Sequence, residues 1–193
     1  MTLATEQGFP FWLAWGTGVR GGALAEQGQV QEGIVQMRQS RNPFVSALLA
    51  AAYGKVGQVE AGLTVLAKAL AFVDKTGLRI SETELYRLKG ELTLQHFNVQ
   101  GSKFKVDNPQ SAFRKPQSEA EERFRKAIEI ARRQQAKSWE LRAVMSLSRL
   151  WQQQGKGAEA RQMLAEMYGW FREGFDTKDL QEARALLHEL KPL

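Results

Sequence analysis

The chain has 193 residues, a net charge of +6 and no cysteine. Without cysteine it has no disulfide and no thiolate metal site, and its two histidines, His96 and His188, are too far apart in the sequence to indicate a histidine-rich metal site. It opens without a basic segment followed by an apolar run, and no run of about 18 apolar residues occurs. We therefore expect a cytoplasmic protein that binds no metal or cofactor and does not enter a membrane.

A helical hairpin is predicted over residues 10–41. Apolar residues from Phe11 to Leu24 recur at spacings of three and four, as they do on one face of a helix. Gly16, Gly18 and Gly21 match the spacing of a dinucleotide-binding fingerprint. That fingerprint requires a strand that turns into a helix, and no strand is predicted here. We interpret these glycines as places where neighbouring helices touch.

The next hairpin covers residues 43–76 and begins at Pro43, because proline is favoured at the first position of a helix. Leu49, Ala50 and Tyr53 then give a leucine, a small residue and, three positions later, an aromatic residue. A small residue lets two helix backbones approach, and a large residue three or four positions further along fills the groove beside it.

A third hairpin over residues 80–135 is expected to contain an inserted loop at 97–117. The loop is rich in glycine, proline, asparagine and serine and shows no clear period. Ser118 followed by Glu121 resembles a capping box, which places the start of the second helix at Ser118.

The inserted loop allows two interpretations. Its aromatic and basic residues could stack on bases and neutralise phosphates, and the chain would then be a nucleic-acid-binding helical protein. Alternatively the loop is a variable connection whose phenylalanines hold it against the helices, which is the interpretation we favour. The basic residues of 123–133 lie among glutamates, so ion pairs would neutralise much of their charge. The candidate loop-site residues are Lys103, Phe104, Lys105, Arg114 and Lys115.

Residues 138–172 predict a fourth hairpin, and residues 177–190 predict a final helix. Leu147, Ser148 and Trp151 repeat the leucine, small and aromatic pattern of the second hairpin. The final helix carries leucines on one face and mixed charges on the other. Such a helix is expected to cap the open apolar end of a stack of hairpins.

The repeated small and large residues are typical of tetratricopeptide (TPR) repeats, each of which is a helical hairpin. The small residue falls at Gly33, Gly62, Ala120 and Ala160. We therefore predict an all-α fold, a TPR-like α-solenoid of about four helical hairpins plus a C-terminal capping helix, in a single domain over residues 1–193.

Several stretches also resemble one kind of TPR region. They are residues 6–12, 25–30, 85–92, 124–134, 150–156 and 174–183. They are similar to the C-terminal TPR region of bacterial multidomain signalling proteins, in which an adenylate/guanylate cyclase or DNA-binding domain and an AAA-type or STAND-type ATPase precede the TPR arm. The sequence contains neither a G-x4-G-K-[S/T] phosphate loop nor paired metal-binding aspartates in a strand context, so neither enzymatic activity is expected of it.

We predict a non-catalytic scaffold for protein–protein or interdomain interaction in bacterial signalling. A TPR superhelix exposes a concave face made by the first helix of each hairpin, and mixed charge with a few aromatic residues there suits a protein, a peptide or a neighbouring domain. Trp12 and Trp15 in the first hairpin could equally dock another domain or a second copy of the chain, which would make a homo-oligomer. The predicted partner-binding residues are Trp15, Glu26, Phe44, Lys55, Glu84, Arg87, Glu91, Arg142, Arg149 and Gln152.

Overall fold

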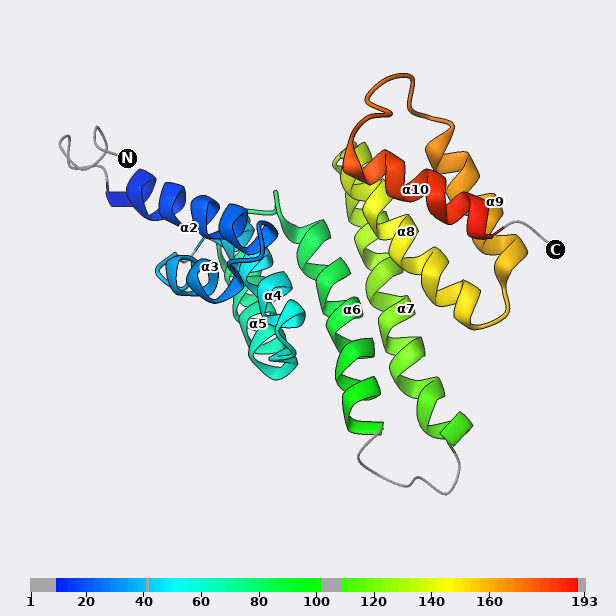
Figure 1. Ribbon diagram of the computed structural model, residues 1–193, viewed down its shortest axis with the longest axis horizontal. Helices are drawn as coiled ribbons and strands as arrows, with labels where there is room; N and C mark the ends of the chain where they lie inside the picture. Colours follow the sequence, from blue (N-terminus) through cyan, green and yellow to red (C-terminus); the bar gives the residue numbers. More distant parts are fainter. Residues whose placement is uncertain (1–9, 41, 102–108, 191–193) are drawn as a thin grey trace.

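The computed structural model describes residues 10–40, 42–101 and 109–190, and these residues form nine α-helices and no strand (Figure 1). The helices are α2 (Pro10–Glu26), α3 (Val30–Met37), α4 (Pro43–Lys55), α5 (Val59–Thr76), α6 (Glu82–Gly101), α7 (Pro109–Arg133), α8 (Lys137–Gln153), α9 (Gly157–Tyr168) and α10 (Lys178–Glu189).

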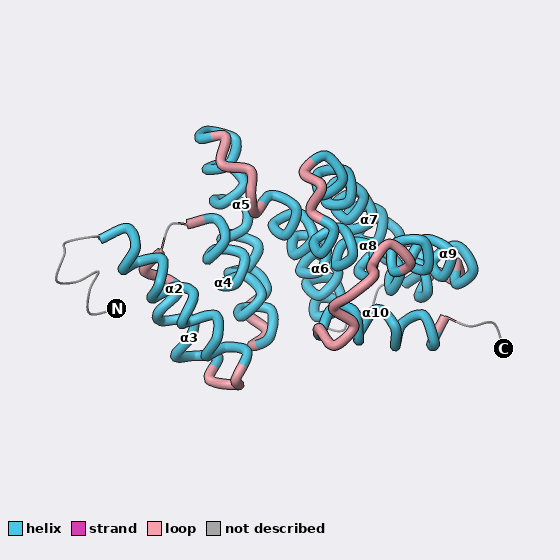
Figure 2. The backbone as a smooth tube through the Cα atoms, turned by 90° about the horizontal axis from the view of Figure 1, so that it is seen from above, coloured by secondary structure: helices cyan, strands magenta, loops and turns pink. Residues whose placement is uncertain are grey.

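The helices form the two layers of a stack. The first helices of the hairpins lie side by side, since α2 contacts α4, α4 contacts α6, α6 contacts α8 and α8 contacts α10. We call the layer formed by α2, α4, α6, α8 and α10 the inner layer. Each of α2, α4, α6 and α8 also packs against the helix that follows it. The four hairpins succeed one another along the molecule, with α2 and α9 towards opposite ends (Figures 1 and 2). This is the all-α stack of hairpins with a final helix that the sequence predicts.

One tight turn recurs at four helix junctions. Gly28, Gly57 and Gly155 have φ angles of 90°, 74° and 78°, and Gln135, between α7 and α8, has a φ of 54°. After each, the next backbone N–H donates to the carbonyl five residues earlier, over 2.9 Å in all four cases. This bond is characteristic of a Schellman ending, in which the left-handed conformation favours glycine. The shared turn gives successive helices a similar antiparallel reversal.

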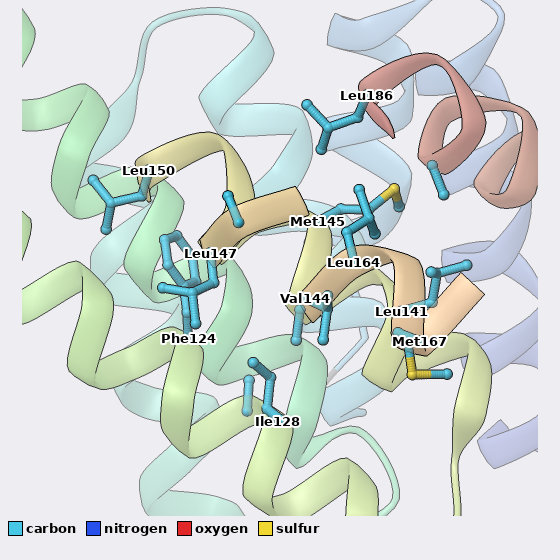
Figure 3. Packing of buried hydrophobic residues seen from close by; sticks show 14 of the residues in the cluster. Phe124, Ile128, Leu141, Val144, Met145, Leu147, Leu150, Leu164, Met167 and Leu186 are labelled. Atoms are coloured by element: carbon cyan, nitrogen blue, oxygen red, sulfur yellow. The ribbon is translucent and has the colours of Figure 1, made fainter. Parts of the chain in front are cut away.

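The core consists of three clusters that succeed one another along the stack. The first cluster is built from residues of α2, α3, α4 and α5, and the next from residues of α4, α5 and α6. The largest is built from residues of α7, α8, α9 and α10. In the largest cluster Phe124 is 1% exposed and lies beside Leu147 of α8 (Figure 3). Because each cluster is built from neighbouring helices, stability depends on contacts between successive hairpins.

Small residues let the helices approach closely, as the pattern predicts. A Cβ added at Gly33 would lie 2.4 Å from the carbonyl oxygen of Gly21, so α2 and α3 touch through their backbones. A Cβ added at Gly90 would lie 2.5 Å from Cε1 of Phe124. Gly18 and Gly21, two of the glycines with fingerprint-like spacing, lie inside α2 against neighbouring helices. Their interpretation as packing glycines is confirmed, whereas it is wrong for Gly16, where an added Cβ has nothing within 4 Å.

The predicted loop at 97–117 is wrong in its bounds, because α6 continues to Gly101 and α7 begins at Pro109. Proline at the first helical position loses no hydrogen bond, so Pro109 starts the helix rather than preventing it. Pro116 lies inside α7 and removes one backbone bond, and the packing of α7 along α6 offsets that loss. Ser118 is consequently an interior helix residue and not a cap.

Candidate interaction surface

The middle of the inner layer carries a partly buried network of ion pairs that is centred on Arg87. Its guanidinium donates to both oxygens of the Glu84 carboxylate, over 2.8 and 2.7 Å, and also to Glu91. The Ser146 hydroxyl of α8 donates to the same Glu91 oxygen over 2.8 Å, and Arg142 of α8 reaches Glu84 over 3.4 Å. The network therefore ties α6 to α8.

Burial and pairing act in opposite directions on these charges. Burial opposes ionisation of Glu84, but the hydrogen bond and charge of Arg87, with the charge of Arg142, outweigh it and hold the pKa of Glu84 below its ordinary value. Burial likewise opposes the charge on Arg87, and its carboxylate partners more than compensate, so its pKa is raised. Glu84 and Arg87 are thus both charged, and each compensates the other within the fold.

Further ion pairs extend this arrangement towards both ends of the inner layer. Arg142 Nε donates to Asp179 of α10 over 2.8 Å, and Arg149 lies 3.3 Å from Glu182 of the same helix. At the other end Lys55 Nζ lies 2.6 Å from Glu26. Hydrogen bonding to Lys55 is the largest influence on Glu26 and lowers its pKa.

An apolar hollow of about 410 Å³ lies near the start of α4 and the connection before α6. Trp12 and Trp15 pack edge to face with their ring centroids 5.7 Å apart. Phe44 occupies the second position of α4, which begins where Asn42 Oδ1 accepts the Phe44 N–H over 2.8 Å. The full lining is Trp12, Trp15, Asn42, Pro43, Phe44, Leu78, Ile80, Ser81 and Trp139.

A second hollow, of about 610 Å³, adjoins the first because Ile80 and Trp139 line both. Its other lining residues are Arg79, Gln134, Ala136, Lys137 and Ser138. The Gln134 amide donates to the backbone carbonyl of Arg79 over 2.7 Å and joins the connection before α6 to the turn before α8. We call the two adjoining hollows together the aromatic groove.

The charged groups of the aromatic groove combine exposed cations with buried carboxylates. Arg79 lies 2.7 Å from Glu82, and Lys137 lies 2.7 Å from Glu140, which Arg132 also contacts over 2.7 Å. The side chains of Glu82 and Glu140 are only 5% and 4% exposed, whereas that of Arg79 is 53% exposed. Solvent at the groove therefore meets the cationic member of each pair first.

Two solved structures share the architecture of this chain. Both are of nearly identical TPR-like repeats from a protein assigned as a kinesin light chain in Podosopora anserina, and the second is a point variant of the first. They are 18% and 16% identical to this chain, with TM-scores of 0.58 and 0.59, and each comparison covers 91% of this chain and 83% of the other. The chain is a TPR-like α-solenoid. No protein-family model and no curated protein matches the sequence.

Within the TPR-like solenoid, six of the ten predicted partner-binding residues form two groups. Glu84, Arg87, Glu91 and Arg142 come together, but they bind one another. Trp15 and Phe44 line the aromatic groove instead. The remaining members are Glu26, Lys55 and Arg149, which form ion pairs, and Gln152, which is exposed on α8. Partner binding by either group remains a prediction.

Sequence reasoning did not select Leu78, Ile80 and Trp139 as binding residues. Leu78 and Ile80 lie in the connection before α6 and are 55% and 75% exposed. Trp139 lies off the apolar stripe of α8 that includes Leu141 and Val144. The sequence offered two signals for these residues: Leu78 and Ile80 are apolar although they lie in a connection, and Trp139 is apolar although it lies off the apolar stripe of its helix.

The candidate loop site lies largely outside the described residues. Lys103, Phe104 and Lys105 fall there, whereas Arg114 and Lys115 belong to α7, on which Lys115 is exposed. The expected neutralisation of basic residues on α7 is confirmed by pairs four and three residues apart, Arg125 with Glu121 over 2.8 Å and Lys126 with Glu129 over 3.1 Å. These pairs reduce the positive field that the nucleic-acid interpretation requires.

The described residues bear on metal binding and on membrane crossing. Among those residues, no three histidine, cysteine or carboxylate groups are placed so that they could hold a metal ion. None of the helices formed by these residues combines the length and apolar character that a bilayer crossing requires.

Proposed function

We propose that this chain is a non-catalytic scaffold that binds a protein segment, or a neighbouring domain of a bacterial cytoplasmic signalling protein, through the aromatic groove. The observation that carries the proposal is the groove itself, in which Trp12, Trp15, Phe44, Ile80 and Trp139 from four separate parts of the chain meet. The TPR-like fold supports it, because stacked hairpins offer extended binding surfaces. The stretches similar to the TPR arms of bacterial signalling proteins support the signalling context.

The chemistry of the aromatic groove supports this use. Rigid aromatic side chains give a large apolar contact at a small cost in conformational entropy, and they dominate the energy of many protein interfaces. The volume of each hollow also falls in the range of sites that hold a bulky group. The central ion-pair network, in contrast, is internally compensated and stabilises the solenoid, so we assign it a structural role.

The test is a pull-down from the source cell with the native chain and two matched variants. Ile80→Asp places a charge in the groove, and Val35→Asp places one on α3 at a comparably exposed apolar residue, 60% against 75% exposed. We expect one protein to be recovered by the native chain and by V35D and to be lost with I80D, while circular dichroism shows that both variants are folded. Equal recovery with I80D would refute the proposal, and recovery of nucleic acid would favour the alternative.

A further inference from the structure

We infer that the aromatic groove accepts a partner segment in which a bulky apolar side chain is flanked by carboxylates. The inference rests on the proposed function and names the chemistry of the partner that the function leaves open.

The apolar part of the inference follows from the first hollow. Its lining contains three tryptophans and a phenylalanine, with Asn42 and Ser81 as the polar residues among those described. Trp12, Leu78 and Ile80 are each more than half exposed, so a partner that covers them removes apolar surface from water. The hollow is large enough for one or two bulky side chains, and an aromatic or leucine residue matches its lining.

The acidic part follows from the charges beside that hollow. Among the described residues that line the two hollows, the charged ones are Arg79 and Lys137, and no carboxylate lines either. Their ion-pair partners are Glu82 and Glu140, and Arg132 also pairs with Glu140, which makes three cations and two carboxylates. The carboxylates are buried, while the side chains of Arg79 and Arg132 are 53% and 62% exposed.

The orientation of the helices adds to this positive character. α6 begins at Glu82 and α8 begins at Lys137, so two long helices start beside the groove. The amino end of a helix carries a partial positive charge. A segment with acidic residues on both sides of its apolar anchor would place them near the exposed cations, whereas a basic segment would meet repulsion.

Four fluorescein-labelled peptides test this chemistry by fluorescence anisotropy. They are Gly-Asp-Glu-Leu-Phe-Glu-Asp-Gly, a neutral form with Ser and Gln for the acids, a basic form with Lys, and an acidic form with Ala in place of Leu and Phe. We expect the acidic apolar peptide to bind about threefold or more tighter than the neutral one and about tenfold tighter than the basic one, because exposed ion pairs each contribute modestly. Replacing Leu and Phe by Ala should abolish binding.

Matched variants connect the preference to the groove. R79Q should reduce the advantage of the acidic over the neutral peptide about threefold, whereas K126Q removes a similarly exposed paired lysine from α7 and should leave that advantage unchanged. I80D should abolish binding of both peptides. Circular dichroism at the assay temperature verifies that each variant is folded.

The possible results separate the inference from the proposed function. Equal binding of acidic, neutral and basic apolar peptides would overturn the acidic partner and leave the scaffold intact. A dimer of the chain alone that I80D dissociates in sedimentation would show that a second copy occupies the groove, and would also overturn the inference. If no peptide binds and the pull-down is insensitive to I80D, both proposals are wrong.

Discussion

Replacing Gly90 by alanine tests the contact between α6 and α7 on which the third hairpin depends. The added Cβ would lie 2.5, 2.9 and 3.0 Å from Cε1, Cδ1 and Cζ of the Phe124 ring. Alanine in place of an interior helical glycine stabilises a helix by about 1 kcal/mol. Overpacking a core destabilises by about 1 to 3 kcal/mol. We therefore expect G90A to lower the free energy of unfolding by up to about 2 kcal/mol.

The same substitution should have the opposite sign when the ring is absent. F124A removes all three contacting atoms and should itself lower the free energy of unfolding by about 3 to 5 kcal/mol, since the side chain is 1% exposed. In that background G90A meets no ring and should stabilise by about 1 kcal/mol. The coupling between the two sites is then about 1 to 3 kcal/mol.

Urea unfolding followed by far-ultraviolet circular dichroism on the four members of the cycle gives this coupling. Gly16 in α2 provides the matched control, because its added Cβ has nothing within 4 Å and G16A should stabilise by about 1 kcal/mol in both backgrounds. If G90A also stabilises equally with and without the ring, Gly90 does not face Phe124. The register of α6 on α7 would then be wrong.

Three further substitutions examine backbone contact, buried charge and pH. G33A should lower the thermal midpoint of unfolding strongly, because its Cβ would lie 2.4 Å from the carbonyl oxygen of Gly21 in α2, and a backbone group cannot change rotamer to avoid it. An unaltered midpoint would contradict the close approach of α2 and α3. R87M leaves the buried carboxylate of Glu84 without its main partner and should destabilise by about 3 to 5 kcal/mol in urea, whereas R149M breaks an exposed pair and should change stability by less than about 1 kcal/mol. Burial opposes ionisation of Glu140, but hydrogen bonds from Lys137 and Arg132 outweigh it and hold the pKa of Glu140 below 4.5. The ionised carboxylate therefore stabilises the fold above that pH. This stabilisation is lost as pH falls through the pKa of the folded state. E140Q should therefore have a lower free energy of unfolding than the native chain near pH 7, and it should lose less of that free energy between about pH 5 and about pH 3. Parallel plots of unfolding free energy against pH for the two proteins would contradict this account.

Local rules were sufficient where neighbours in the sequence determine the structure. The spacing of apolar residues places the four hairpins, and the leucine, small and aromatic pattern at Leu49, Ala50 and Tyr53 lies on a buried face of α4. They failed between α6 and α7, where the density of glycine and proline predicted a longer loop. Proline is compatible with the first turn of a helix, so Pro109 is the first residue of α7, although its presence was interpreted as part of a loop.

The candidate site was predictable only in part. The periodicity projects Glu84, Arg87 and Arg142 onto one face, but it does not reveal that long charged side chains on adjacent helices will pair with one another. The aromatic groove combines residues near positions 12, 43, 79 and 139, and their proximity arises from stacking rather than from sequence. Trp15 and Phe44 were predicted in advance as binding residues, whereas the exposure of Ile80 is known only from the structure.

The close glycine packing of α2 has a consequence for how the groove is occupied. Over residues 12–26, whose side chains are described, α2 contributes a single buried apolar side chain, Ala25, so the helix that carries Trp12 and Trp15 is anchored by little apolar area. Local opening should begin there and expose amides of α2 to hydrogen exchange. A ligand that requires this wall in place raises the free energy of its opening by about 2.7 kcal/mol at a hundred times its Kd. Slowed exchange of the α2 amides would therefore report occupancy of the groove, and global unfolding, which also opens this wall, would be opposed by the same free energy.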